Sequence, residues 1–280
     1  MEAHGRPSVG FLDLEEFFMK RWLLCVAIVG AVSATPVEAG APAKKKLLVI
    51  TESKGFVHPV VRRGKDDALS LVEKTFIEWG NKSGLFEATV SQDSRKDITA
   101  ENLKNFDAVW FYTTGELPLS DVQKADLLEF VRSGKGFGGC HSAADTFYKW
   151  KEYGELIGAY FAGHPPGYQK IRVIVEDTKH PATKHFGESF AIEDEIYQYK
   201  EPYSRTSLHV LMRIDPESHK NVWRKDGDNP LAWTRDYGKG RVFYTALGHA
   251  EHVWRDQRYQ DHVLGGLRYI FFVENPKKAP

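Results

Sequence analysis

The sequence predicts an α/β domain in which a mostly parallel β-sheet is covered by helices on both faces. Strand and helix patterns alternate over residues 44–176, which is the order that parallel sheets require. The predicted strands are short and almost entirely apolar, as expected for strands buried on both faces. Residues 190–246 are richer in extended segments, so we expect an added C-terminal β segment beside the parallel sheet.

The alternating part of the chain begins and ends with a strand. Apolar residues at helical spacing identify the first helix, and Ser120 with Gln123 forms a capping box that starts the third. The expected strands span residues 44–51, 85–91, 107–113, 136–140 and 171–176. The expected helices span residues 60–79, 99–106, 120–134 and 150–161.

The rest of the chain combines extended segments with one closing amphipathic helix at residues 256–272. Glycines at positions 238 and 240 mark a turn between the last two extended segments. The extended segments span residues 190–199, 207–214, 231–235 and 241–246. Because we find no internal repeat, low-complexity tract or linker, residues 40–280 are predicted to form a single domain.

The N-terminal part of the chain has the layout of a Sec-type signal peptide. Lys20 and Arg21 precede a short apolar run at residues 22–32, and small-x-Ala cleavage patterns end at Ala34 and Ala39. The pattern predicts a signal peptide at residues 19–39 and a periplasmic or secreted protein. An N-terminal membrane anchor or a buried helix is the alternative, but the run is too short to span a bilayer comfortably.

Residues 1–18 contain several carboxylates, unlike the basic start of a signal peptide. We therefore interpret them as an extension upstream of the true initiator, Met19.

The composition excludes some classes of protein. Thirty-eight basic and 38 acidic side chains give a formal net charge of zero, whereas nucleic-acid binding requires a basic surplus. Two cysteines cannot form a disulfide framework, and 280 residues suffice to bury a full core without one. We therefore expect a small-molecule partner. The oligomeric state does not follow from these numbers.

Polar residues follow several predicted strands at the point where each strand ends. Open parallel sheets bind ligands at the carboxyl ends of their strands, so these residues are candidates for one shared site. A single histidine is commonly structural, but several at one edge of a sheet indicate function. The candidates are His58, Thr113, Gly115, Glu116, His141, Ser142, Asp145 and His249.

The turn after the strand at residues 136–140 resembles a nucleophile elbow, because a glycine-rich strand leads into a short polar turn. Cys140 and Ser142 are the candidate nucleophiles, and either requires a base within hydrogen-bond reach. Alternatively, Cys140 is the last buried residue of the strand and Ser142 caps the turn. We favour burial of Cys140 because the apolar pattern ends there and polarity begins at His141.

Further histidines and carboxylates suggest a metal. His164 lies between a glycine and two prolines, which suits a side chain that must be aimed, and Asp194 and Glu195 belong to a run of carboxylates. Nitrogen and oxygen atoms of this kind bind divalent metals such as zinc. The candidate ligands are His141, His164, His249 and Glu195. No HExxH spacing is present, so acid/base catalysis by the same histidines is equally open.

Aromatic residues near these motifs suit the binding of a sugar ring. Tyr197 follows the carboxylate run, and Trp233 lies in an extended segment. Ordinary core packing accounts for most of the other aromatic residues.

Together these motifs resemble the ThuA-like family, named for a trehalose-utilisation protein, over residues 46 to about 273. Each motif is weak by itself, but the set is specific. The motifs are Gly55-Phe56-x-His58, Thr113-Thr114-Gly115-Glu116, Gly139-Cys140-His141-Ser142-Ala143-Ala144-Asp145-Thr146-Phe147, Gly158-Ala159-Tyr160-Phe161-x-x-His164-Pro165, Asp194-Glu195-x-Tyr197, Pro230-Leu231-Ala232-Trp233, Gly238-Lys239-Gly240-Arg241-Val242-Phe243-Tyr244 and Leu247-Gly248-His249.

The resemblance implies a flavodoxin-like, three-layer fold similar to that of class I glutamine amidotransferases. Those enzymes carry a cysteine nucleophile at the elbow, whereas Cys140 matches a position that is usually aliphatic in the ThuA-like family. His141 then occupies the elbow, which argues against amidotransferase chemistry. The family is linked to the use of disaccharides and their 3-keto derivatives.

We therefore predict an exported enzyme that acts on a disaccharide or 3-keto-glycoside as a hydrolase, lyase or isomerase. His141, His164 and His249 are the predicted acid/base groups or metal ligands. The alternatives are a non-catalytic carbohydrate-binding protein and a hydrolase that uses Cys140 or Ser142. The predicted substrate-binding residues are His58, Thr113, Gly115, Glu116, Ser142, Asp145, Asp194, Tyr197 and Trp233.

Overall fold

The computed structural model describes residues 43–219, 224 and 226–273. The predicted signal peptide at residues 19–39 and the extension at residues 1–18 lie outside this part of the chain. Residues from Ala43 onward form one compact unit. Within the described residues, no helix combines the length and apolar character needed to cross a membrane.

The architecture is an α/β fold built on a mixed sheet whose core strands are parallel. Within the described residues the sheet has nine strands, in the order β2-β1-β3-β4-β11-β10-β9-β6-β7. The five parallel strands are β1 (Lys45–Ile50), β2 (Phe86–Ser91), β3 (Ala108–Phe111), β4 (Gly136–Cys140) and β11 (Gly240–Thr245).

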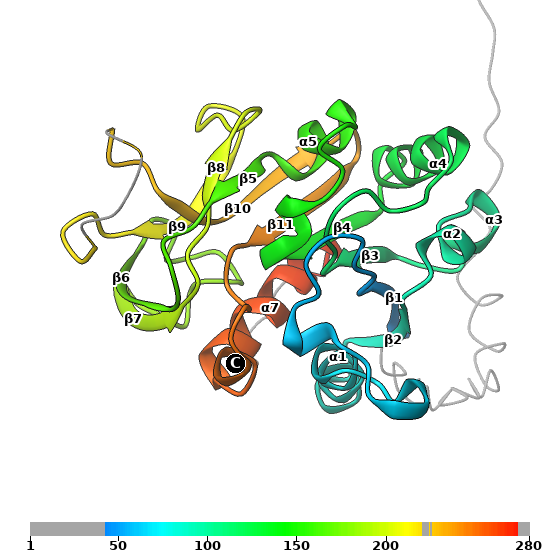
Figure 1. Cartoon of the computed structure of the whole chain (residues 1–280), viewed down its shortest axis with the longest axis horizontal. Helices are drawn as coiled ribbons and strands as arrows, with labels where there is room; N and C mark the ends of the chain where they lie inside the picture. Colours follow the sequence, from blue (N-terminus) through cyan, green and yellow to red (C-terminus); the bar gives the residue numbers. More distant parts are fainter. Residues whose placement is uncertain (1–42, 220–223, 225, 274–280) are drawn as a thin grey trace, which may run out of the picture. The chain divides into compact units, whose positions relative to one another are not determined.

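An antiparallel extension continues the sheet beyond β11. Its strands are β10 (Pro230–Tyr237), β9 (His209–Ile214), β6 (Gln169–Val175) and β7 (Ser189–Asp194). A separate antiparallel pair consists of β5 (Tyr160–Gly163) and β8 (Gln198–Lys200). Figure 1 shows this extension beside the parallel strands, with the short pair above it.

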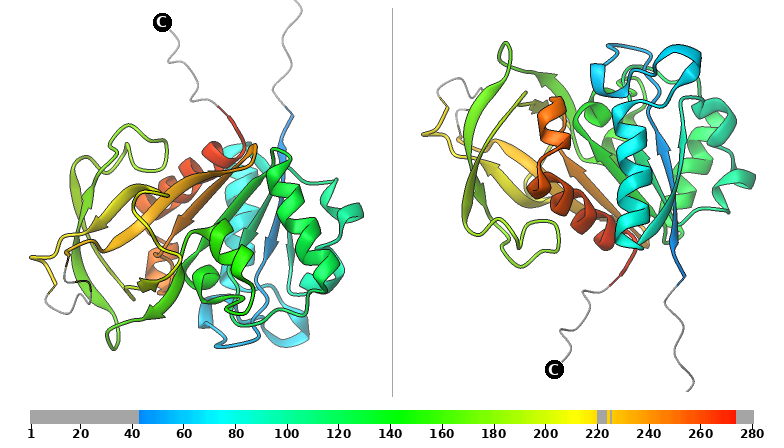
Figure 2. Two further views of the ribbon diagram at one scale, coloured as in Figure 1. Left: turned by 90° about the horizontal axis from the view of Figure 1, so that it is seen from above. Right: turned by 90° about the horizontal axis from the view of Figure 1, so that it is seen from below.

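Helices cover both faces of the parallel part, as the sequence predicts. One face carries α1 (Leu71–Ser83), α6 (Glu251–Trp254) and α7 (Gln257–Ile270), and the other carries α4 (Asp121–Arg132) and α5 (Lys151–Ile157) (Figures 1 and 2). The short helices α2 (Ser94–Asp97) and α3 (Ala100–Leu103) precede β3, and α3 packs on α4. The described part of the chain also contains the 3₁₀ helices η1 (Pro59–Val61), η2 (Lys65–Asp67) and η3 (His141–Asp145).

The apolar strands form the core because both of their faces are covered. Trp110 of β3 is fully buried, and its ring centroid lies 5.3 Å from that of Phe76 on α1 and 6.0 Å from that of Phe243 on β11. Burial of a large apolar side chain such as Phe76 contributes about 1.5–3 kcal/mol to stability. Gly138 of β4 lets the strand pass Trp110, because a Cβ atom there would lie 2.2 Å from Cε3 of the indole.

Two predicted helices differ from their expected bounds for reasons that the structure shows. The helix predicted at residues 60–79 begins at Leu71, because Ser70 and Glu73 form a capping box and 3₁₀ turns precede them. The helix predicted at residues 150–161 ends at Ile157, because Gly158 adopts a left-handed conformation with φ of 102°. The chain then enters β5, which contains Tyr160 and Phe161.

The strand predicted at residues 171–176 does not continue the parallel sheet. The position beside β4 is taken by β11, and β6 pairs antiparallel with β9 and β7. A tight turn after Tyr237 joins β10 to β11, so the chain returns to the parallel core only at its last strand. The extended segment predicted at residues 190–199 is divided between β7 and β8, which belong to different sheets.

Candidate functional site

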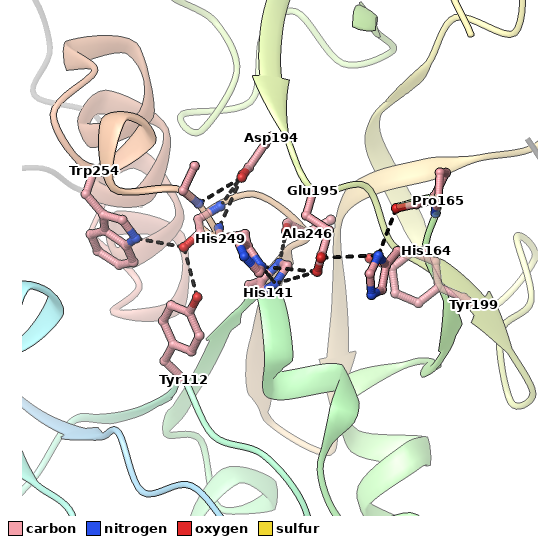
Figure 3. Close-up of polar contacts among 12 residues, drawn as sticks. Tyr112, His141, His164, Pro165, Asp194, Glu195, Tyr199, Ala246, His249 and Trp254 are labelled. Carbon is pink, nitrogen blue, oxygen red and sulfur yellow. Dashed lines mark hydrogen bonds and ion pairs between the residues drawn. The ribbon is translucent and has the colours of Figure 1, made fainter. Parts of the chain in front are cut away.

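The predicted site forms where β4 and β11 end and where β7 of the antiparallel extension meets them. His141 follows β4 directly, His249 lies in the loop after β11, and Glu195 follows β7. His58 comes from the loop after β1, and His164 from the loop after β5. Figure 3 shows the side chains of His141, His164, Glu195 and His249 directed toward one another.

The backbone at His141 makes the sharp turn that the sequence predicts for an elbow. Its φ angle is +45°, an uncommon value for a residue with a side chain. The hydroxyl of Tyr244, on the neighbouring strand β11, donates to the carbonyl of His141 at 2.7 Å and so holds the turn in place. The carbonyl of Ala246 lies 2.9 Å from Nδ1 of His141 and can only accept, so Nδ1 carries the proton. In the neutral ring Nε2 is therefore the nitrogen that carries the lone pair, whereas only the protonated ring can donate from Nε2 to Glu195.

The loop that carries His249 is held by Asp194, the last residue of β7. Its carboxylate accepts backbone N–H groups from Gly248 at 2.7 Å, Ala250 at 2.9 Å and His249 at 3.3 Å. Asp194 is fully buried; burial raises its pKa, and these donors oppose the shift. The predicted substrate-binding residue Asp194 is thus a positioning residue for His249, because its oxygens are already occupied.

Gly248 allows this loop to bend. Its φ angle is +117°, and a Cβ atom there would lie 2.6 Å from the hydroxyl oxygen of Tyr259. Its carbonyl accepts hydrogen bonds from Tyr112 at 2.9 Å and from the indole of Trp254 at 2.8 Å (Figure 3). The loop is therefore fixed on both sides by buried groups.

Nitrogen and oxygen atoms of three side chains converge at one point. Nδ1 of His249 lies 3.0 Å from Nε2 of His141. Oε2 of Glu195 lies 3.3 Å from Nε2 of His141 and 3.1 Å from Nδ1 of His249. Burial by itself raises the pKa of Glu195, but hydrogen bonds from the two histidines outweigh it, so this pKa lies well below its usual range.

His58 completes this cluster, although the sequence suggested only a substrate contact for it. Its ring centroid lies 4.9 Å from that of His141 and 5.0 Å from that of His249. Burial, together with the charges of His141 and His249, lowers its pKa to about 2. Its Nδ1 is buried and has no hydrogen-bond partner among the described residues. A buried nitrogen without a partner is costly unless a ligand satisfies it.

The group that can hold a metal ion differs from the predicted one in one ligand. One ligand atom from each of His58, His141, Glu195 and His249 lies within 4.8 Å of the others. Zinc bonds of about 2.0–2.1 Å in a tetrahedron place ligand atoms roughly 3.3 Å apart, close to the three distances above. The hydrogen bond that orients His141 through Ala246 is the kind of support that metal-binding histidines have. We call these four residues the His/Glu cluster.

His164, predicted as a metal ligand, lies at the other oxygen of Glu195. Its Nδ1 is 3.2 Å from Oε1 of Glu195 and 2.9 Å from the carbonyl of Pro165. The carbonyl of Pro165 accepts the hydrogen bond of Nδ1, and the carboxylate of Glu195 lies within ion-pair distance of the same nitrogen. His164 is thus a neighbour of the His/Glu cluster rather than a member of it.

A cavity of about 320 Å³ opens beside the His/Glu cluster. Asp145 and Tyr197, both predicted substrate contacts, lie in its wall. Burial raises the pKa of Asp145, although a hydrogen bond from the hydroxyl of Tyr148 opposes the shift. The ring of Tyr197 lies 4.1 Å from that of His141. The lining residues are Phe56, His58, Asp145, Phe161, His164, Glu195, Tyr197 and His249.

Three predicted substrate contacts near β3 support the neighbouring loops instead. The buried hydroxyl of Thr113 pairs with that of Thr146 at 2.9 Å. Gly115 has a φ angle of +73°, and a Cβ atom there would lie 2.7 Å from the backbone nitrogen of Gly55. Glu116 is exposed and accepts the backbone N–H of Lys149.

Trp233, predicted to face a sugar, is a core residue. It is fully buried, and its indole donates to the carbonyl of Ile157 at 2.8 Å. Its ring centroid lies 4.4 Å from that of Tyr244, the residue that holds the turn at His141.

The two candidate nucleophiles are buried at the elbow. Cys140 is the last residue of β4, and burial raises the pKa of its thiol to about 12, opposite to what a thiolate nucleophile requires. The hydroxyl oxygen of Ser142 is buried without a partner among the described residues. Neither side chain lines the cavity.

Sequence reasoning missed two aromatic residues in the cavity wall. Phe56 stands two residues before His58, and Phe161 was assigned to a helix although it lies in β5. The signal for Phe56 was its place in the loop after β1, where every side chain is a candidate for a ligand contact.

Comparisons with known proteins agree with this fold. The model of the ThuA family, described as trehalose utilisation, matches residues 46–270. A solved ThuA-like protein from Bacteroides uniformis ATCC 8492 is 21% identical, covers 83% of this chain and 93% of its own, and has a TM-score of 0.66. A ThuA-like protein from Parabacteroides merdae ATCC 43184 is 19% identical, with coverages of 85% and 93% and a TM-score of 0.65. No curated protein matches the chain significantly.

Replacement of Asp194 tests its positioning role. Asp194→Ala leaves three backbone N–H groups without their acceptor, so we expect the free energy of unfolding to fall by about 3 kcal/mol in urea denaturation. Glu193→Ala is the matched control, since that side chain points to the other face of the strand. Equal stability of the two variants would show that Asp194 does not hold the loop.

Proposed function

The chain belongs to the ThuA family, and from this membership and the His/Glu cluster we propose that it is an exported enzyme acting on a disaccharide or a 3-keto-glycoside. A carbohydrate-related role follows from the family in general. The choice of substrate, the chemistry and the export are our proposal.

The observation that carries the enzymatic proposal is the convergence of three imidazoles and a carboxylate beside a cavity. A protein that only binds sugar gains nothing from nitrogen atoms 3.0 Å apart, with a further buried nitrogen left without a partner. Titratable groups that share a buried cleft are typical of catalytic sites.

The keto group of the proposed substrate determines which bond can break. A ketone at C3 acidifies the hydrogen on C2, so an imidazole nitrogen can remove that proton as a general base. The electron pair left on C2 forms a double bond to C1, and the bond from C1 to the glycosidic oxygen breaks. The leaving oxygen then takes a proton. The net reaction is an elimination that releases the second sugar or the aglycone.

The residues in the cavity wall can divide these tasks. His249 lines the cavity and is held by Asp194, which suits a base that must be aimed when its ring is not bound to a metal ion. Asp145 lies in the wall of the same cavity, and burial raises its pKa, which is the direction that a proton donor requires. His164 restrains Glu195 from the side opposite to the His/Glu cluster.

We further propose that the His/Glu cluster holds a divalent ion such as zinc. The fit rests on the partnerless nitrogen of His58 and on the lone pair of His141 Nε2, which is directed at Glu195 and His249. A bound ion of this kind would polarise the carbonyl of the substrate as a Lewis acid.

The metal proposal predicts a specific pattern of ligand loss. We expect purified protein to bind about one zinc ion per chain in elemental analysis. His58→Ala and His249→Ala should each weaken zinc affinity at least roughly tenfold in a chelator competition, because each removes a ligand. His164→Ala should bind zinc far better than these two, and the exposed His252→Ala should behave as wild type. Wild-type protein without affinity for zinc, or full affinity in His58→Ala, would contradict this assignment.

Turnover of 3-keto-trehalose tests the reaction. We expect His249→Ala and Glu195→Gln to lower kcat/KM at least roughly 100-fold, because each alters a group at the reacting centre. Cys140→Ala is the control, since its thiol lies outside the cavity, and it should keep wild-type activity once folding is verified by circular dichroism. Unchanged turnover in His249→Ala would refute acid/base or metal-assisted chemistry here. Loss of activity in Cys140→Ala would favour a hydrolase that uses the thiol. If wild type binds the sugar but forms no product, the protein is a carbohydrate-binding protein.

Export is proposed from the signal-peptide pattern at residues 19–39. Cleavage after Ala39 predicts that the protein recovered from the periplasm or the medium begins at Gly40. N-terminal sequencing of that fraction tests this prediction. Recovery of the protein only from the cytosol, with Met1 intact, would contradict both the export and the internal start.

A further inference from the structure

Exposed apolar side chains gather around the cavity. Among the described residues, six large hydrophobic side chains are exposed, and four of them belong to loops that border the cavity. These four are Phe56, Val57, Tyr148 and Tyr168; the other two are Val122 on α4 and Phe272 after α7. Exposed aromatic side chains that cluster beside a cavity are typical of ligand-binding surfaces.

Phe56 and Tyr168 are the most exposed aromatic residues of this group. Phe56 is 62% exposed, and its ring centroid lies 4.8 Å from that of His58. Tyr168 is 51% exposed, and its ring centroid lies 5.5 Å from that of His249. Both contacts are edge-to-face, so the aromatic rings are not stacked flat on the histidines. Each ring keeps a large open surface directly beside a member of the His/Glu cluster.

The cavity itself is small. Its volume of about 320 Å³ is at the low end of the roughly 300–1,000 Å³ found for ligand pockets. Its wall contains the rings of Phe161 and Tyr197, whose centroids are 4.2 Å apart. A single sugar ring suits this space, whereas a second ring joined to it has to extend beyond the wall.

We infer that Phe56 and Tyr168 form a second subsite, which binds the sugar ring or apolar aglycone attached to the ring held in the cavity. The C–H face of a pyranose packs on an aromatic ring as other apolar surfaces do, and the hydroxyl of Tyr168 can hydrogen-bond at the same time. The inference rests on the proposed function, because it requires a saccharide in the cavity. It makes the preferred ligand a glycoside rather than a free monosaccharide.

The position of this subsite also suits the proposed reaction. Elimination breaks the bond between the two rings, so the reacting atoms lie between the cavity and the second subsite. Contacts to the leaving ring hold the scissile bond beside His249 without touching the reacting atoms. Phe56 and Tyr168 are thus specificity-determining residues rather than catalytic ones.

Calorimetric titration with two probes tests the inference. Glucose serves as the single-ring probe and trehalose as the two-ring probe, and neither carries the keto group that would allow turnover. We expect wild type to bind trehalose roughly tenfold or more tightly than glucose, and Tyr168→Ala to lose most of that preference while its glucose affinity stays unchanged. Because Phe56 also lines the cavity, Phe56→Ala should weaken both affinities, and that of trehalose much more than that of glucose. Phe56→Tyr and Tyr168→Phe should retain the preference for trehalose.

Phe272→Ala is the matched control for removing an exposed aromatic ring. Phe272 is 44% exposed and packs over Arg241 at the start of β11, the end opposite to the cluster. The second subsite would be overturned if wild type bound trehalose and glucose with equal affinity. It would also be overturned if the two alanine variants kept the wild-type ratio of trehalose to glucose affinity, or lost both affinities equally. These outcomes would not contradict the proposal that the cavity binds a saccharide. If wild type binds neither sugar, the saccharide site fails and the inference fails with it.

Discussion

The buried carboxylate of Asp194 joins the two halves of the sheet at the candidate site. It belongs to β7 at the edge of the antiparallel extension, yet it accepts N–H groups from the loop that follows β11 in the parallel core. The same strand delivers Glu195 one residue later. A single strand end therefore fixes the loop of His249 and supplies the carboxylate that the histidines surround, which is why the site depends on how the extension folds back.

Placing three imidazoles together in the buried His/Glu cluster costs electrostatic free energy. Three imidazoles in a buried space repel one another when protonated, and desolvation adds to that cost, as the lowered pKa of His58 reflects. Glu195 offsets part of this through its contacts with His141 and His249. A buried group of this kind costs stability unless each polar atom has a partner, and these four side chains could hold a metal ion.

Much of the site could be predicted because parallel strands end at one edge of a sheet. His58, His141 and His249 each follow a parallel strand, and general knowledge of such sheets is enough to bring them together. The burial of Cys140 could also be predicted, because the apolar pattern of its strand ends at that residue. The structure places Thr113 and Gly115 against neighbouring loops and Trp233 in the core, because a position at or near a strand does not reveal whether a side chain points to the ligand, to a loop or to the core.

The sequence by itself determined the alternation of strands and helices, the capping box that starts α4 and the turn that places His141, because each rests on interactions within a few residues. Only the tertiary structure decided that β11 rather than β6 lies beside β4, that Asp194 holds a loop 54 residues further along the chain, and that His58 replaces His164 in the cluster. Strand order and side-chain direction depend on pairing between distant segments, and local propensity carries no information about that pairing.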